Sequence, residues 1–153
     1  MDLFAELVAL VQAFELAGLD YALCGGVALA VHGLPRATKD IDVLVRAEDL
    51  ARIRELASSS GFTVEALPMT FSSSGITVHR FTKFAAGEAL MLDVLIADGP
   101  LEAVWGTRER LPYSDGEISV VSRVGLISLK LAAGRPQDLV DIQRLQELDD
   151  ADG

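Results

Sequence analysis

The sequence predicts an α/β (α+β) domain in which helices flank a mixed β-sheet, and three observations lead to this fold class. Half of the residues are apolar, a composition typical of a folded globular chain. The 153 residues match the size of one domain and contain no repeat, linker or low-complexity stretch. Helical and strand-like apolar patterns also alternate along the chain. We therefore expect a single domain over residues 1–153.

Up to residue 60 the pattern alternates helices with short buried strands. Leu3, Leu7, Leu10 and Phe14 recur at helical spacing, and Gly18 is placed to end that helix. β-branched residues at alternate positions favour a strand further on. The expected elements are a helix from Leu3 to about Gly18, a strand at Tyr21–Cys24, a helix at Val27–Gly33, a strand at Asp40–Val45 and a helix at Glu48–Ser60.

The rest of the chain is expected to be β-rich in its middle and helical at its end. Clusters of Gly and Ser mark the turns between strands. Gly134 is placed to stop the penultimate helix and Pro136 to begin the last one. The expected elements are strands at Phe62–Ala66, Gly75–Phe84, Leu90–Ile96 and Ile118–Val121, and helices from Gly99 to about Trp105, at Arg123–Ala133 and at Pro136–Leu148, with residues 149–153 as a frayed tail.

The composition excludes several classes of protein. The formal charge of −10 disfavours an extensive nucleic-acid surface. A single cysteine, Cys24, excludes an intramolecular disulfide and a multi-thiolate zinc site, and in its apolar context it is interpreted as a small buried side chain. The first residues lack a positively charged leader, and the longest uncharged stretch is too short to span a bilayer. We expect a cytoplasmic protein without a membrane segment.

The motif that carries chemistry is a Gly-Gly turn followed by two alternating aspartates. Gly25-Gly26 opens a predicted helix, whose first N–H groups favour anions. Thirteen residues separate Gly26 from Asp40, which shares one face of a strand with Asp42, and the two can bind the same divalent metal. Taken alone, the turn is more often structural, and the aspartate pair more often a solvated strand end. Their combination indicates a site for phosphate and metal.

Asp93 strengthens this interpretation because it is a lone carboxylate in an otherwise apolar strand. A buried unpaired carboxylate is costly, so Asp93 needs a partner or a metal. If its strand lies beside that of Asp40 and Asp42, the three carboxylates converge. They could then bind two Mg²⁺ ions and leave one carboxylate to accept a proton from an attacking hydroxyl.

The other charged residues of interest can be interpreted either as ligands of the nucleotide or as structural residues. Arg36 and Lys39 precede the first aspartate and could reach triphosphate oxygens, or could simply face solvent. Lys130 lies in a strongly apolar helix, from which it either extends to solvent or projects into the site. Asp138 and Asp141 share a helix face, where their structural role is to complement the helix N-terminus and pair with Arg135.

These residues resemble a known family. The Gly-Gly turn, the Asp-Ile-Asp motif and the later strand carboxylate are similar to the nucleotidyltransferase superfamily related to DNA polymerase beta. The segment from Lys130 to Ile142 resembles the C-terminal motif of the AbiEii-type bacterial nucleotidyltransferases, which include toxins of toxin–antitoxin and abortive-infection systems. The match covers most of the chain, from Tyr21 to about Leu145. One departure is Gly26, where many members carry Ser, so that a hydroxyl contact to phosphate is lost.

The resemblance implies a nucleotidyltransferase fold and transfer of a nucleoside monophosphate from an NTP to a hydroxyl. The acceptor would be RNA, a protein or a small molecule, and a toxin–antitoxin partner protein is also implied. By the same resemblance, Mg²⁺, as two ions, would be held by Asp40, Asp42 and Asp93, the last also helping to activate the acceptor. Gly25 and Gly26 would bind phosphates through their backbone N–H groups, and Lys130 would contact the triphosphate. Asp138 would lie near the nucleotide site in a supporting or acceptor-side role. Arg36 and Lys39 are added as candidate nucleotide-binding residues from their position before Asp40, not from the resemblance.

Two rival functions belong to other classes. One is a non-catalytic, nucleotide-binding or regulatory partner of a toxin–antitoxin pair, which the presence of all three carboxylates disfavours. The other is a sugar-nucleotide transferase with an Asp-x-Asp motif, which the short chain disfavours because it leaves little room for a separate acceptor domain.

Overall fold

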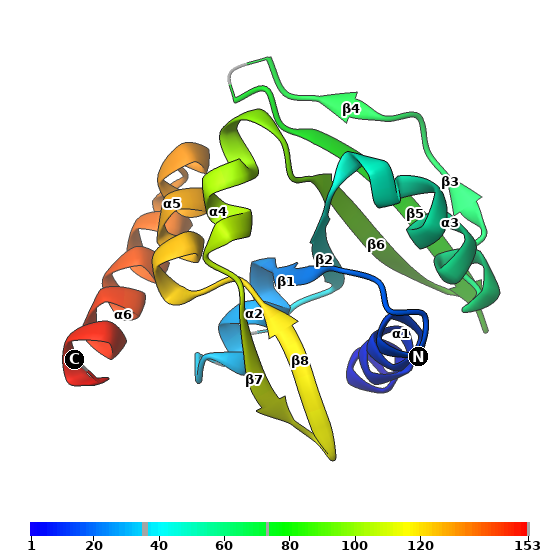
Figure 1. Cartoon of the computed structure of the whole chain (residues 1–153), viewed down its shortest axis with the longest axis horizontal. Coiled ribbons are helices and arrows are strands. Elements are labelled where there is room, and N and C mark those ends of the chain that lie inside the picture. Colours follow the sequence, from blue (N-terminus) through cyan, green and yellow to red (C-terminus); the bar gives the residue numbers. More distant parts are fainter. Residues whose placement is uncertain (35–36, 73, 153) are drawn as a thin grey trace.

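A single mixed sheet organises the molecule (Figure 1). The computed structural model describes residues 1–34, 37–72 and 74–152. The strands follow the order β3-β5-β6-β2-β1-β8-β7, and β4 pairs with β5 beside this path. Their bounds are β1 Ala22–Cys24, β2 Asp40–Val45, β3 Val64–Glu65, β4 Met69–Thr70, β5 Thr77–Ala85, β6 Glu88–Ile96, β7 Glu109–Tyr113 and β8 Gly116–Val120.

The centre of the sheet combines both pairing directions, which confirms the predicted mixed sheet. β2 runs parallel to β6 and antiparallel to β1, while β1 runs parallel to β8. The helices are α1 Leu3–Leu16, α2 Gly25–Val31, α3 Leu50–Ser59, α4 Glu102–Gly106, α5 Arg123–Ala133 and α6 Pro136–Asp152, with short 3₁₀ turns at Ala47–Asp49 and Gly99–Leu101. No helix in the described part of the chain is both long and apolar enough to cross a membrane.

The alternation of side chains along β5 gives the sheet two different faces. Phe81 is buried, and Lys83 on the same face forms an ion pair with Glu6 of α1. Arg80 points to the other face, where it meets Asp93 of β6. The first face is therefore covered by the N-terminal helix, whereas the second carries the charged residues singled out in the sequence.

The structure differs from the sequence prediction at two edge strands and at the C-terminus. β4 is only two residues long and follows Pro68. β7 contains Pro112, which has no N–H, and a strand tolerates proline only where no N–H donor is needed. Helix α6 continues to Asp152, beyond the end at Leu148 that the sequence predicts. Arg123 contributes to this extension, because it donates to the Leu148 carbonyl and pairs with Asp149.

Helix α5 ends as the sequence predicts and packs closely at its start. Gly134 adopts φ +66°, the left-handed conformation that commonly terminates helices. Near the other end, a Cβ on Gly125 would lie 2.3 Å from Thr107 Oγ1 and 2.5 Å from Val121 Cγ1. Because Gly125 has no side chain, α5 packs closely against the segment after α4 and the end of β8.

We predict that Gly125→Ala lowers the free energy of unfolding by about 2 kcal/mol, because the methyl group overlaps two packed side chains. In a domain of this size the melting temperature should fall by roughly 4–8 °C in differential scanning calorimetry. Gly106→Ala is the matched control, since its Cβ meets nothing within 4 Å. Equal melting temperatures for the two variants would contradict the close packing of α5.

Candidate functional site

Four polar or ionisable side chains form one row across four neighbouring strands. Cys24 of β1 pairs with Asp42 of β2, Asp42 with Asp93 of β6, and Asp93 with Arg80 of β5. Because residues opposite each other in a sheet point to the same face, the two carboxylates lie side by side between a thiol and a guanidinium. Asp40 belongs to the same face of β2, two residues from Asp42. The convergence of three carboxylates expected from the sequence is therefore present in the strand register.

The carboxylates destabilise one another's charged forms. Burial, followed by the neighbouring charges of Asp93 and Asp40, raises the pKa of Asp42 to about 7. The pKa of Asp40 is also raised, first by burial and then by Asp93. Such a cluster favours binding of a cation, since a positive charge would relieve both burial and repulsion.

Arg80 supplies one positive charge to this cluster. Its Nε donates to Asp93 Oδ1 at 2.7 Å and its Nη2 to Asp93 Oδ2 at 2.9 Å. Asp93 is only 7% exposed, so the predicted requirement for a partner or a metal is met by a two-pronged ion pair. Sequence reasoning missed Arg80, although a cation in the predicted strand at residues 75–84 was a detectable signal.

The Gly-Gly turn is shaped by its contact with the site. Gly25 has φ +67°, and a Cβ there would lie 2.1 Å from Asp42 Oδ2. A Cβ on Gly26 would lie 2.7 Å from Thr38 Oγ1. Both positions therefore exclude a side chain, and Gly25 brings the backbone at the start of α2 against the Asp42 carboxylate. The turn opens a helix, as the sequence predicts.

The C-terminal helices place a second charged group opposite the first. Lys130 Nζ lies 2.9 Å from Asp141 Oδ2 and 3.4 Å from Asp138 Oδ1. Asp138 is 1% exposed and accepts hydrogen bonds from the Arg135 backbone N–H at 3.1 Å and from Arg135 Nε at 2.8 Å. These bonds to Arg135 lower the pKa of Asp138 and keep it ionised. Asp138 thus holds the two cations and has both oxygens engaged, which sequence reasoning anticipated only in part.

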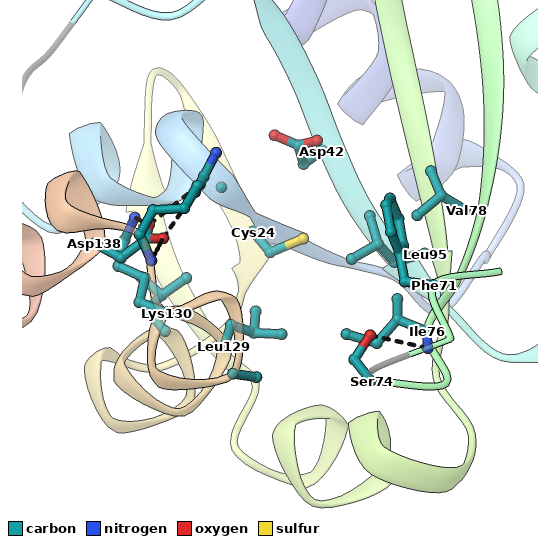
Figure 2. Close-up of a pocket in the computed structure, with 14 residues that line it drawn as sticks. Cys24, Asp42, Phe71, Ser74, Ile76, Val78, Leu95, Leu129, Lys130 and Asp138 are labelled. Carbon is teal, nitrogen blue, oxygen red and sulfur yellow. Dashed lines mark hydrogen bonds and ion pairs between the residues drawn. The ribbon is translucent and has the colours of Figure 1, made fainter. Parts of the chain in front are cut away.

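A pocket of about 460 Å³ joins the two charged groups, a volume suited to a nucleotide-sized ligand. Figure 2 shows Asp42 at one end, Lys130 and Asp138 on the side of the C-terminal helices, and an apolar wall opposite them. That wall comes from β5, β6 and the segment before β5. The lining residues that matter here are Gly25, Asp42, Lys130, Arg135, Asp138 and the apolar Phe71, Ile76, Val78 and Leu95.

The remaining predicted residues stand apart from this pocket or beyond the description. Lys39 is exposed and adjacent to Asp40, whose pKa its charge slightly lowers. Arg36 lies outside the described residues. Among the described residues, no group of three or more His, Cys, Asp or Glu side chains is arranged closely enough to bind a metal ion as it stands.

Comparisons with known proteins agree with this geometry. The family model described as Nucleotidyl transferase AbiEii toxin, Type IV TA system, matches residues 8–153. No curated protein matches the sequence. Three solved structures share the fold at 15% sequence identity each. TM1012 from Thermotoga maritima, described as a nucleotidyltransferase, has a TM-score of 0.69, and the match covers 94% of this chain and 92% of that chain. The antibiotic-resistance factor ANT(2'')-Ia matches in its solution structure with a TM-score of 0.61 (97% of this chain and 83% of that chain) and in its complex with adenylyl-2''-tobramycin with a TM-score of 0.57 (95% and 93%).

We predict that Asp42→Asn stabilises the metal-free protein in a pH-dependent manner. The folded-state pKa of about 7 exceeds the value of about 3.9 for an unfolded aspartate, so folding keeps a proton that the unfolded chain releases. The resulting cost is fully present above about pH 7 and disappears below about pH 4. With a chelator at pH 8, the melting temperature of Asp42→Asn should exceed that of the wild type by about 3 °C or more, and the two should converge at pH 4. A lower melting temperature for the variant at pH 8 would contradict the raised pKa.

Proposed function

The chain belongs to the AbiEii family of nucleotidyl transferases, and on this premise we propose that it transfers a nucleoside monophosphate from an NTP to an acceptor hydroxyl. The observation that carries the proposal is the row of Asp42, Asp93 and Arg80 across the sheet, in which Asp42 lines a nucleotide-sized pocket. The family description names a toxin of a type IV toxin–antitoxin system, and an antitoxin partner belongs to the same proposal.

The donor set suits Mg²⁺, which prefers carboxylate oxygens. Three aspartates and one arginine give the cluster a formal charge of −2, which one divalent ion balances, and a second ion would arrive with the triphosphate. Asp40, Asp42 and Asp93 would hold these ions. Bound Mg²⁺ would withdraw negative charge from the phosphate under attack.

The residues of the chain then have defined roles in the proposed reaction. Backbone N–H groups of Gly25 and Gly26 bind phosphate oxygens at the start of α2. Lys130 and Arg135 neutralise the triphosphate from the opposite side of the pocket. The acceptor oxygen attacks the α-phosphorus, the bond to the β-phosphate oxygen breaks, and pyrophosphate leaves. Asp93 takes the proton of the acceptor hydroxyl.

The surroundings of the pocket support the choice of the acceptor class to test first. The sequence has no Lys or Arg between Arg54 and Arg80, which is the stretch that supplies Phe71 and Ile76 to the pocket wall. An apolar, uncharged wall favours a small molecule or a protein side chain over the phosphate backbone of RNA. The structural neighbour ANT(2'')-Ia has been solved with an adenylylated small molecule, tobramycin, which makes a hydroxylated small molecule the first acceptor to test.

One observation favours the alternative of a non-catalytic nucleotide-binding partner. The intact set of carboxylates would imply catalysis if Asp93 needed a metal, but Arg80 already pairs with it. Binding of NTP without pyrophosphate release, over all four NTPs and with RNA, protein and small-molecule acceptors, would establish this alternative.

We predict that Asp42→Ala reduces nucleotidyl transfer by at least about a thousandfold, because the remaining carboxylates cannot hold the metal in place. The assay follows labelled NTP and pyrophosphate in the presence of Mg²⁺ and the acceptor. Asp98→Asn is the control, as Asp98 is exposed and lies beyond the end of β6. Wild-type rates in Asp42→Ala would refute the catalytic assignment.

We also predict that Lys130→Ala raises the KM for NTP by about tenfold or more, since one charge-assisted contact to phosphate is lost. Steady-state kinetics at saturating acceptor measure this change. Lys83→Ala removes a lysine that also pairs with a carboxylate, Glu6, but on the opposite face of the sheet, and should leave KM unchanged. An equal change of KM in both variants would show that Lys130 acts through stability alone.

A further inference from the structure

Arg80 binds the same carboxylate, Asp93, that the proposed function assigns to a divalent ion. Each oxygen of Asp93 accepts one hydrogen bond from the Arg80 guanidinium, so a metal that bound the remaining lone pairs of Asp93 would lie close to the positive charge of Arg80 and would be repelled by it. The pair lies next to Asp42 in the row across the sheet. A metal held by Asp42 and Asp93 would therefore approach the positive charge of Arg80 directly.

The two members of the pair differ in their access to water. The Arg80 side chain is 40% exposed, whereas that of Asp93 is 10% exposed. Arg80 can thus leave Asp93 and remain solvated, because its charge is already near the surface. Asp93 cannot lose a partner without a large cost unless another cation replaces it. This asymmetry makes an exchange of cations on Asp93 feasible and makes simple separation costly.

The positive charge of Arg80 also acts on the two other carboxylates of the cluster. It lowers the pKa of both Asp40 and Asp42, against the larger effects of burial and of the other carboxylates. Lys39 acts in the same direction on Asp40 and Arg135 on Asp42, but Arg80 acts on both and also forms the ion pair with Asp93.

We propose that Arg80 is an internal counter-ion that occupies Asp93 in the metal-free protein and competes with divalent metal for this carboxylate. The proposal rests on the metal assignment of the proposed function. Arg80 is a positioning residue in this scheme: it preserves the fold of the empty cluster and lowers the affinity for the ion that replaces it.

The test is metal binding without nucleotide, with Mn²⁺ as the probe in isothermal titration calorimetry. Arg80→Gln should bind Mn²⁺ at least about fivefold more tightly than the wild type, because a competing and repelling charge is removed. In the presence of a chelator the same variant should melt at a lower temperature, since Asp93 is left unpaired. Added Mn²⁺ should then raise its melting temperature more than that of the wild type.

Arg110→Gln is a matched control at the other edge of the sheet. Arg110 also binds a carboxylate through two hydrogen bonds, to Glu15 at 2.7 and 2.9 Å, and is 48% exposed. This variant should leave the affinity for Mn²⁺ unchanged. Arg80→Lys keeps the positive charge but loses the planar guanidinium that binds both oxygens of Asp93. Its affinity for Mn²⁺ should lie between those of the wild type and Arg80→Gln. This variant tests the proposal even if Arg80→Gln does not fold.

Unchanged or weaker Mn²⁺ binding in the Arg80 variants would overturn the proposal and assign Arg80 a structural or orienting role. Absence of Mn²⁺ binding in wild type and variants alike would overturn it together with the metal assignment. Tighter binding in a protein that transfers no nucleotide would support the proposal and contradict only the proposed function, so the two failures are distinguishable.

Discussion

The parallel register of β2 and β6 is the constraint on which the site depends. It sets Asp42 directly beside Asp93, and alternation along β2 adds Asp40 to the same face. Carboxylates placed in this way repel one another and lose hydration, as the pKa of about 7 for Asp42 indicates. The fold must therefore provide positive charge or polar groups nearby. The neighbouring strands and helices meet this need on three sides of the cluster.

Each of those neighbours is adapted to the cluster by a specific residue. β5 contributes the guanidinium of Arg80, and the start of α2 approaches Asp42 closely only because Gly25 has no side chain. Across the pocket, Asp138 is almost fully buried and holds Lys130 and Arg135. The negative charge at one end of the pocket thus faces two cations at the other end, whose charges are formally offset by Asp138 and Asp141. A triphosphate with its metal ions is complementary to both ends.

Much of this could be predicted from the sequence, because the signals were local. The Asp-Ile-Asp alternation predicted β2 with its correct bounds, and the apolar surroundings of Asp93 indicated its need for a partner. The identity of that partner could not be predicted, since it depends on the antiparallel register of β5 against β6. The short edge strand β4 and the proline-containing β7 were missed because their residues lack strand propensity and are paired through tertiary contacts.

The role of Asp138 illustrates how a structure changes the meaning of a family motif. In the sequence, a carboxylate of the C-terminal motif is naturally assigned to the nucleotide. In the structure both of its oxygens are bound to Arg135 and Lys130, and the side chain is 1% exposed. A buried carboxylate with two cationic partners cannot approach a triphosphate, whose charge has the same sign. We therefore propose that Asp138 acts on the nucleotide through the two cations that it orients, so that this part of the motif supports Lys130 and Arg135.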